Sequence, residues 1–442
     1  MAPVEMAGLA DLIPLQELSF YARDVDEVHE AFAEVRRREP VFWHETGGFW
    51  VLMRHGDQRR VGSNPQVFSS RFGFQIADTF PVEQVMENLP DWAQDQLREP
   101  GLTPAQQRGI IARAKVSIGD PELESVIVTD PPKHLQHRKV MTNGLTPKII
   151  RGLEPEIIDI VDDALDGAPA GSTVEFVEAV ARRIPLMVIG ALLGVPKEES
   201  AQFVEYADAF MATVILNERD PEKMARNRRL LQEFSDYILR LIAEKRANPG
   251  EDLLSGMLAT ELDGAPVPEK TVQMLVRSLI SGGTDTTKHL LAWVAYNLGT
   301  RPEARALLRE RPELAANAVT EITRWSPIVW SQARTALEDT EIGDKTIRAG
   351  DFVVMVFPSA NRDEDAWDRP FEFDITREFK VQTMAFGWGE HLCPGNPLAR
   401  LEAKILIDRL TARYADYEVV GEPERFCSSF INGLRTLDVR FS

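Results

Sequence analysis

Residues 386–395 read Phe386-Gly387-Trp388-Gly389-Glu390-His391-Leu392-Cys393-Pro394-Gly395 and decide the fold of the chain. The glycines before the cysteine allow a tight backbone turn, and the proline after it has a φ suited to the first position of a helix. We therefore expect Cys393 at a helix start, where the positive end of the helix favours the metal-binding thiolate over the thiol. A buried structural thiol in a glycine-rich turn is the alternative that this stretch alone leaves open.

A helix is predicted directly after this stretch, because apolar residues recur there at helical spacing with charged residues between them. The pattern Phe-Gly-x-Gly-x-His-x-Cys-x-Gly resembles the cysteine loop of the cytochrome P-450 family, in which the cysteine is an axial ligand of haem iron. The resemblance covers roughly residues 41–442. It implies haem b as the cofactor, Cys393 as the iron ligand, and Phe386 and His391 as further cofactor contacts.

The composition is that of a globular chain, with 44% hydrophobic residues. Its 442 residues would allow about three domains by length alone, but we see no linker or repeat and expect one domain over residues 1–442. The net charge of −19 argues against nucleic acid as a partner, since binding a phosphate backbone needs clustered cations. Apolar stretches are too short to span a membrane, and Cys393 and Cys427 are too few for a disulfide framework, so we expect a cytoplasmic protein without a membrane anchor.

Two cations share one face of a helix that is predicted to begin after Asp130-Pro131-Pro132. His134 and Arg138 lie four residues apart, so both project from the same side and would suit an anionic group. A solvated basic helix face is the alternative. The family resemblance implies that His134 and Arg138 bind the haem propionates, together with Arg334, which matches by family position.

A long helix is predicted from about Pro268 to Leu298, with Gly282-Gly283-Thr284-Asp285-Thr286 at its middle. Two glycines inside a helix cost about 1 kcal/mol each relative to alanine, so they need a reason. They either let a water or another group approach and open the helix, or they mark a close crossing with a second helix. The stretch resembles the distal helix of the family, which implies that Gly282 and Gly283 lie beside the haem.

A third pattern is Glu321-Ile322-Thr323-Arg324, which alone is an ordinary helical pair of an acid and an arginine. By position it matches the Glu-x-x-Arg motif of the family, whose buried pair steadies the region before the cysteine. The resemblance implies Arg377 as the third member. An arginine satisfied on several sides in this way is structural, not catalytic.

Aromatic and β-branched runs predict a small β part. Residues 41–43 and 49–53 flank a glycine-containing turn and predict a hairpin, and residues 334–343 and 347–355 predict short strands. Residues 73–128 follow no regular period, and we assign them no structure. The resemblance implies a mainly α fold with a minor β part, the single-domain cytochrome P-450 fold, in which haem lies between the distal long helix and the cysteine-loop helix of a helix-rich triangular prism.

The function implied by the resemblance is a monooxygenase that inserts one oxygen atom from O₂ into a C–H or C=C bond of a small hydrophobic substrate. Thr286 is expected to hold a reaction intermediate and a water, and Asp285 to relay protons. Family position implies substrate contacts from Gly282, Val329 and Trp330. Terpenoids, aromatics and steroids are the expected substrate classes, and the protein is expected to be a monomer.

Electrons are expected from a ferredoxin and its reductase, because the sequence shows no flavin, nicotinamide or iron–sulfur motif. A basic docking patch for such a partner is predicted from Lys133, Lys139, Arg400, Lys404 and Arg409. Ordinary solvated charges are the alternative for each. Two other functions remain open: a haem-thiolate protein that binds a ligand without turnover, and a peroxide-driven oxygenase. Asp285 and Thr286 together favour the enzyme that uses O₂.

Two segments depart from the family pattern. Pro394 has no N–H, so the amide directly after Cys393 cannot donate a hydrogen bond to the sulfur. We expect a more electron-rich thiolate, and a haem that is harder to reduce, than in a relative with leucine at this position. Residues 379–383 lack the proline, asparagine and histidine that relatives carry there, which affects the expected path of that loop.

Overall fold

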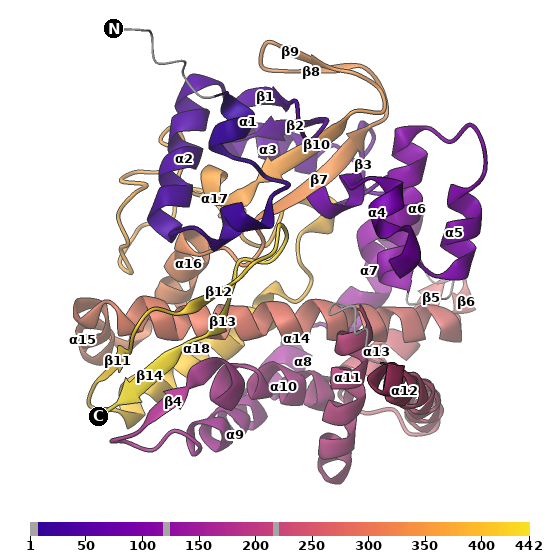
Figure 1. Ribbon diagram of the computed structural model, residues 1–442. Coiled ribbons are helices and arrows are strands. Elements are labelled where there is room, and N and C mark those ends of the chain that lie inside the picture. Colours follow the sequence, from indigo (N-terminus) through magenta and orange to yellow (C-terminus); the bar gives the residue numbers. More distant parts are fainter. Residues whose placement is uncertain (1–7, 118–123, 215–220) are drawn as a thin grey trace, which may run out of the picture. The chain divides into compact units, whose positions relative to one another are not determined.

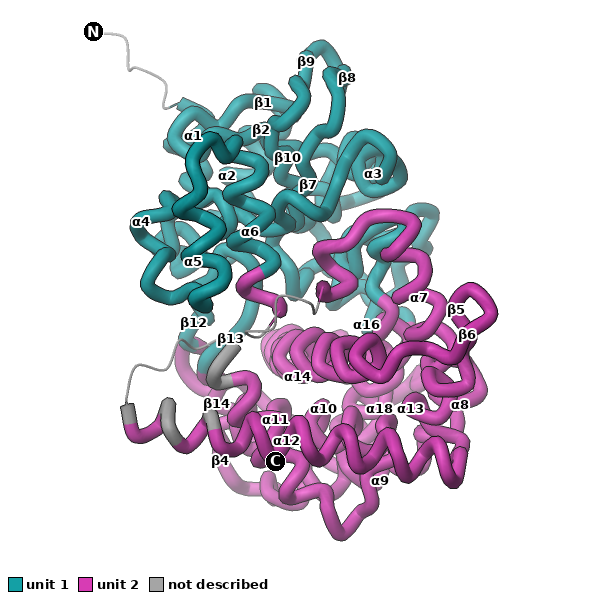
Figure 2. The backbone as a smooth tube through the Cα atoms, turned by 90° about the vertical axis from the view of Figure 1, so that its right-hand side faces the viewer, with its two compact units in different colours: residues 1–113, 317–393, 424–435 teal, residues 114–316, 394–423, 436–442 magenta. Residues whose placement is uncertain are grey.

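The computed structural model describes residues 8–117, 124–214 and 221–442 and groups the chain into two compact units (Figure 2). Unit 1 consists of residues 1–113, 317–393 and 424–435, and unit 2 of residues 114–316, 394–423 and 436–442. Each unit therefore combines segments that are far apart in the sequence. The expected organisation as one domain over the whole chain stays a prediction.

Unit 1 contains a mixed five-stranded sheet of order β1-β2-β10-β7-β3 (Figure 1). β2 and β10 run parallel, and the other neighbours are antiparallel. The strands are β1 (Val41–His44), β2 (Phe49–Leu52), β3 (Phe68–Ser69), β7 (Ser331–Ala336) and β10 (Phe352–Val356). The predicted hairpin is confirmed by β1 and β2, and the predicted strands after residue 334 are confirmed by β7 and β10.

Helix α2 (Val25–Arg38) packs its apolar side into the aromatic core of unit 1. Asp24 caps its start, since the side chain accepts hydrogen bonds from the first backbone amides of the helix. Acidic residues in the first turn and arginines in the last turn complement the helix dipole. Val28 and Phe32 belong to the same buried cluster as the β2 residues Phe49 and Val51, so the apolar side of α2 shares its core with the sheet.

The remaining elements of unit 1 are short. They are α1 (Leu9–Leu12), α3 (His55–Gly62), α4 (Val82–Val85), α5 (Asp91–Leu97), α6 (Pro104–Ser117), α16 (Ala315–Trp325), α17 (Phe357–Ala360), β8 (Thr340–Ile342), β9 (Lys345–Ile347), β12 (Glu424–Phe426) and β13 (Gly433–Thr436), of which α6, α16 and β13 extend slightly past the limits of the unit. Residues 73–128, which the sequence left unassigned, contain α4, α5 and α6. Residues 118–123 of that segment lie outside the described residues.

Unit 2 is organised around the long helix α14 (Glu269–Gly299), which runs horizontally in Figure 1. Its bounds confirm the helix predicted from Pro268 to Leu298. The chain is α-helical through Gly282 and Thr286, so the opened helix that the sequence allowed is not present there. α10 (Arg183–Leu193) and α18 (Asn396–Arg413) pack against α14, and α10 ends where Gly194 adopts the left-handed conformation.

The other elements of unit 2 surround this centre. They are α7 (Lys133–Gly144), α8 (Pro147–Gly152), α9 (Glu154–Leu165), α11 (Ser200–Val214), α12 (Pro221–Ala247), α13 (Leu253–Leu258), α15 (Pro302–Glu310), β4 (Thr173–Glu175), β5 (Glu261–Leu262), β6 (Ala265–Pro266), β11 (Tyr417–Val419) and β14 (Asp438–Phe441). β11, β14 and β4 form a three-stranded sheet. β5 and β6 form a small antiparallel hairpin.

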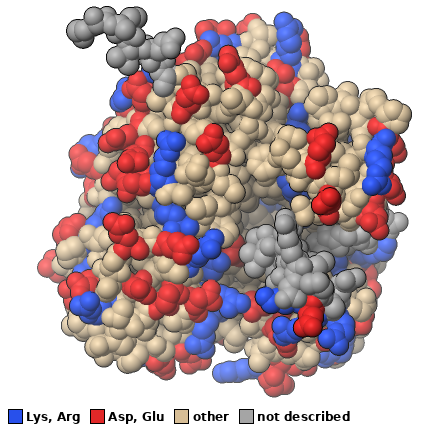
Figure 3. All heavy atoms as spheres, viewed as in Figure 1, with Lys and Arg blue, Asp and Glu red and all other residues tan. Residues whose placement is uncertain are grey.

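The mainly α composition with small sheets confirms the expected fold class. Across the parts of the chain that the structure describes, the helices lack an apolar stretch of transmembrane length. Acidic and basic side chains are interspersed on the face shown in Figure 3, as expected for a chain with many charges of both signs.

Candidate functional site

The loop that carries Cys393 is a tight turn closed by its own backbone. The Cys393 amide donates a hydrogen bond of 2.9 Å to the carbonyl of Phe386. Gly387 and Gly389 have φ values of +75° and +72°, which side-chain-bearing residues rarely adopt. The two glycines that the sequence singled out are therefore required by the turn.

Helix α3 holds the same loop within unit 1. A β-carbon on Gly389 would lie 1.9 Å from the Gly62 carbonyl oxygen, so the two backbones touch. The Arg59 guanidinium lies 5.5 Å from the centroid of the Trp388 ring, within the range of a cation–π contact. His391 Nε2 lies 3.0 Å from Ser70 Oγ, within hydrogen-bond distance. The cysteine loop is thus held by α3 and by Ser70, which directly follows β3.

The prediction that Cys393 lies at a helix start is wrong. α18 begins at Asn396, with Gly395 as its N-cap, and the proline in its first turn is Pro397 instead of Pro394. Pro394 and Gly395 form a turn that separates Cys393 from the helix. Since the helix dipole acts mainly within the first turn, it favours the Cys393 thiolate less than the sequence argument assumed.

Glu321, Arg324 and Arg377 lie together inside unit 1. Both Arg324 and Glu321 are completely buried, and Arg324 binds the two carboxylate oxygens at 2.8 and 2.7 Å. Arg377 Nε donates to Glu321 Oε2 at 3.1 Å. The Asp374 amide donates to Glu321 Oε1 at 2.8 Å, and Arg324 also donates to the Asn361 carbonyl at 3.0 Å. The cluster ties α16 to the chain leading toward the cysteine loop, as a structural group would.

The other predicted site residues of unit 1 differ in burial. Arg334 on β7 is buried and donates a hydrogen bond of 2.7 Å to the neighbouring Ala333 carbonyl. Trp330 is buried, with its ring 5.4 Å from that of Tyr21, and belongs to the core of unit 1. Val329 is half-buried. The core packing accounts for Trp330 without a substrate, whereas the predicted substrate role stays a prediction for both residues.

Helix α7 carries the predicted propionate ligands of unit 2. His134 is buried and Arg138 is half-buried, one turn apart on the same helix. His137, which the sequence did not single out, is also buried, and burial together with the nearby Lys133 lowers its pKa to about 4. His137 is therefore neutral at neutral pH, and no sequence signal distinguished it from its neighbours.

Helix α14 carries the predicted proton-handling pair. Thr286 Oγ1 donates a 2.5 Å hydrogen bond to the Gly282 carbonyl one turn earlier. Asp285 accepts a 2.5 Å hydrogen bond from Lys288 Nζ, with both side chains largely buried. Lys288 was not identified from the sequence, although its position three residues after Asp285 was the available signal.

The two glycines of α14 have different surroundings. A β-carbon on Gly283 would lie 2.9 Å from Ile189 Cδ1 on α10, so this glycine allows α10 and α14 to pack closely. A β-carbon on Gly282 would meet nothing within 4 Å. The helix-crossing alternative therefore explains Gly283, and Gly282 is the glycine for which packing offers no reason. Contact of either with a cofactor stays a prediction.

Glu402 is a buried carboxyl group on α18 that the sequence analysis did not identify. It is 2% exposed, and burial raises its pKa to about 8. It is therefore largely protonated at neutral pH. In the sequence it reads as one of the charged residues between apolar ones on that helix, which predicts an exposed position.

The five cations of the predicted docking patch all have partners in unit 2. Lys133 pairs with Glu124 at 2.6 Å, Lys404 with Asp408 at 2.7 Å, and Arg409 with Asp162 at 2.7 Å, while Lys139 binds the Glu261 carbonyl and Arg400 the Asn396 side chain. Three of the five charges are thus balanced by a neighbouring carboxylate. The patch is less positive than its cations alone suggested.

The donors present fit a haem. Among the described residues, His, Cys, Asp and Glu side chains do not gather in groups of three that could hold a metal ion. A single thiol on a rigid loop suits a metal that arrives with its own nitrogen donors, as porphyrin iron does. The family resemblance assigns the two propionates to His134, Arg138 and Arg334, and this assignment stays a prediction.

Comparisons with known proteins agree on one family. The family model "Cytochrome P-450" matches residues 105–415. Linalool 8-monooxygenase of Pseudomonas putida is 32% identical, covering 93% of this chain and 95% of that protein, and steroid C26-monooxygenase of Mycolicibacterium smegmatis is 29% identical, covering 93% and 90%. Among solved structures, CYP109Q5 from Chondromyces apiculatus is 30% identical with a TM-score of 0.77 and covers 97% of each chain. CYP109E1 from Bacillus megaterium in complex with testosterone is 27% identical, with a TM-score of 0.74 and coverage of 93% and 98%.

The cofactor of such a protein is haem. The fold, the cysteine loop and the match over most of the chain lead to one conclusion. The chain belongs to the cytochrome P-450 family and is a haem-thiolate monooxygenase.

Proposed function

We propose that this monooxygenase hydroxylates a small apolar substrate of the terpenoid or steroid class, using electrons from a ferredoxin and its reductase. The names of its relatives support the substrate class, since they include a linalool and a steroid monooxygenase. Structures similar to this one contain testosterone or pseudoionone. The observation that carries the proposal is the presence of Asp285 and Thr286 on adjacent positions of α14, because a protein that only binds ligands needs no proton-handling pair.

The cofactor would be held by the residues that the family resemblance implies. Cys393 would bind the iron, and His134, Arg138 and Arg334 would bind the propionates. The close contact of Gly389 with Gly62 is made by backbone atoms and helps to hold the cysteine loop in place. Bound haem would supply the activation of O₂.

The residues proposed to transfer protons lie on α14. The Thr286 hydroxyl is already a donor to the Gly282 carbonyl, so its oxygen is directed to accept a hydrogen bond from a water or a bound group. Asp285 is adjacent in sequence and can take a proton from solvent and pass it on. In each cycle the carboxyl group gains and loses one proton and ends unchanged.

A spectral binding screen of the purified protein tests the proposal. Terpenoids, steroids and aromatics are titrated while the spin-state change of the haem absorption is followed, and the best binders are then assayed for product with ferredoxin, reductase and NADH. We expect a terpenoid or steroid to bind most tightly and to be hydroxylated. Product with hydrogen peroxide but none with ferredoxin would select the peroxide-driven oxygenase, and tight binding without product by either route would select the ligand-binding protein.

A further inference from the structure

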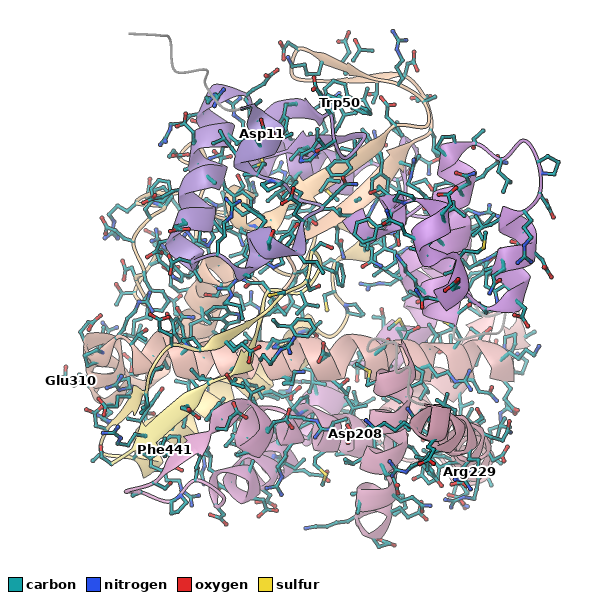
Figure 4. The ribbon with its side chains drawn as sticks, in the orientation of Figure 1. Asp11, Trp50, Asp208, Arg229, Glu310 and Phe441 are labelled. Carbon is teal, nitrogen blue, oxygen red and sulfur yellow. The ribbon has the colours of Figure 1, made fainter. Side chains whose placement is uncertain are left out.

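An open groove in unit 1 lies between α4, the 3₁₀ turn Met86–Asn88, α5 and α6 (Figure 1). Its volume is about 670 Å³, which is within the size range of small-molecule sites. Figure 4 shows the side chains that project from these helices. None of the predicted site residues lines the groove, so the predicted haem site does not account for it.

The groove has an apolar wall. Val82 on α4 and Met86 are half-buried, and Leu97 at the end of α5 is 7% exposed. A methionine side chain is flexible and polarisable, so this wall can adapt to apolar groups of different shape. Burial of apolar ligand surface against these three side chains would favour binding.

Two carboxylates line the same groove. Glu83 and Glu87 are exposed and lie four residues apart, so two like charges share one wall. Within the described residues, neither carboxylate has a hydrogen bond or an ion pair with another side chain. The one cation in residues 81–99 is Arg98, which pairs with Asp95 at 3.0 Å. No cation of this segment therefore balances the charge of the two glutamates.

We propose that the groove binds an amphipathic organic cation. Its charged nitrogen would lie beside Glu83 and Glu87, and its apolar part would pack against the apolar wall. A neutral apolar ligand fits less well, because it would remove the carboxylates from water without giving them a partner. A calcium or magnesium ion also fits less well, because it needs more oxygen ligands than two carboxylates supply and the apolar wall offers none. The inference goes beyond the proposed function and does not depend on turnover.

Calorimetric titration of the haem-containing protein with phenylbutyltrimethylammonium tests the proposal. The nitrogen of this cation has no lone pair, so it cannot bind iron as an amine can. Phenylbutanol is the neutral probe of similar shape. We expect the cation to bind about tenfold more tightly than the alcohol at low salt, because each exposed ion pair contributes about threefold in affinity. The difference should shrink at high salt, since salt screens exposed charges.

Variants of the groove test each part of the proposed contact. Glu83→Gln and Glu87→Gln should each reduce the preference for the cation about threefold, and the double variant should abolish it, with the affinity for phenylbutanol unchanged. Met86→Gln keeps the side-chain length, makes the apolar wall more polar, and should weaken both probes alike. Glu99→Gln is the matched control, because this exposed glutamate belongs to the same acidic segment and does not line the groove.

Four results would overturn the inference. The first is a wild-type protein with no preference for the cation, and the second is an equal loss of preference in Glu99→Gln and the groove variants, which would show that only total charge matters. The third is a change in haem absorption that follows cation binding equally in the wild type and the double variant, which would place the cation at the haem. The fourth is binding of neither probe together with a dimer that the double variant dissociates, which would make the groove a contact between two copies of the chain. Failure to hydroxylate any substrate would contradict the proposed function and leave these binding results unaffected.

Discussion

The backbone of Gly389 touches that of Gly62, such that a β-carbon on Gly389 would lie 1.9 Å from the Gly62 carbonyl oxygen. This contact joins the cysteine loop to α3 at a point where both partners are backbone and cannot rotate away. Gly387, two residues earlier, has a similar positive φ, but a β-carbon there would meet its nearest atom only at 3.6 Å. A side chain at Gly387 would therefore cost stability only through its unusual φ. A side chain at Gly389 would add the cost of a steric collision.

We predict that Gly389→Ala is far more damaging than Gly387→Ala. Alanine at Gly387 should cost about 1–2 kcal/mol of unfolding free energy, the usual cost of a left-handed conformation. Alanine at Gly389 adds the collision with Gly62 and should cost at least about 4 kcal/mol, with loss of the thiolate-type carbon monoxide spectrum. Denaturant unfolding and the reduced carbon monoxide spectrum measure both. Equal losses in the two variants would show that the collision is relieved by movement of the loop.

The amide next to the sulfur is the subject of a second prediction. The Cys393 amide already donates to the Phe386 carbonyl, and Pro394 has no amide hydrogen to donate. Pro394→Leu restores a donor that stabilises the more negative, reduced form of the site. We expect the haem reduction potential to rise by about 40 mV, the equivalent of about 1 kcal/mol for one electron.

Pro397→Leu is the matched control, because this exposed proline lies in the first turn of α18. It changes the same residue type without placing an amide next to Cys393, and the potential should not change. Spectroelectrochemical titration of the three proteins measures the difference. A Pro394→Leu variant with the potential of the wild type or lower contradicts the prediction.

The glycine pair of α14 gives a third prediction. Gly282→Ala should raise the unfolding free energy by about 1 kcal/mol, because alanine is a better helix former and its methyl group meets nothing within the protein. Gly283→Ala has the same gain but must displace Ile189, so its net effect should be smaller or destabilising. If Gly282 lies beside the cofactor, its variant should also change the haem spectrum or substrate affinity, which Gly283→Ala should change less. Equal stabilisation by the two substitutions would mean that Ile189 on α10 moves aside without a loss of unfolding free energy.

Sequence reasoning succeeded where the signal was local. The β1–β2 hairpin follows from aromatic and β-branched runs around a glycine-containing turn, and α14 matches the long helix predicted from about Pro268 to Leu298. The position of Cys393 before its helix was missed, because a proline followed by a glycine can begin a helix or form a turn, and the pattern alone does not distinguish them. Within residues 73–128, α4 and α5 are shorter than two helical repeats and so show no period. The longer α6 does not separate its apolar residues from its polar ones along the helix.

Tertiary partners account for the rest. Gly283 is explained by Ile189, which is distant in sequence and lies on another helix. Glu402 looks like an exposed charge in a helical repeat and is buried only because other helices cover α18. Contacts of this kind depend on the packing of several helices, which the spacing of residues within one helix does not reveal.

Burial of Glu402 makes the stability of the protein depend on pH. The pKa is about 8 in the folded protein and about 4.5 in an unfolded chain, so between these values the folded state keeps a proton that the unfolded chain has lost. The free energy of unfolding should therefore fall as the pH rises from about 4.5 to 8 and then level off. Glu402→Gln removes this term, and its stability relative to the wild type should increase by roughly 3–4 kcal/mol between pH 5 and pH 8. Glu418→Gln, at an exposed carboxylate of the same unit, is the control. Its unfolding free energy should change with pH in the same way as that of the wild type.

The paired cations of α18 lead to a prediction about ferredoxin docking. Arg409 donates to Asp162 on α9, and one turn further along α18 Arg413 pairs with Asp166, the C-cap residue of α9. If Arg409 belongs to the docking patch, Asp162→Asn exposes its positive charge and lowers the KM for an acidic ferredoxin by about threefold at low salt. The effect should shrink at high salt, because screening weakens long-range attraction between charges.

Asp166→Asn is the matched control for this test, since it frees Arg413, which lies outside the predicted patch, and changes the net charge by the same amount. Steady-state reduction kinetics with ferredoxin at two salt concentrations compares the variants. Equal changes in KM would show that total charge matters and the position of Arg409 does not, whereas a change confined to Asp162→Asn would place Arg409 in the docking surface. The comparison is informative because the two ion pairs join the same two helices and differ mainly in their position along them.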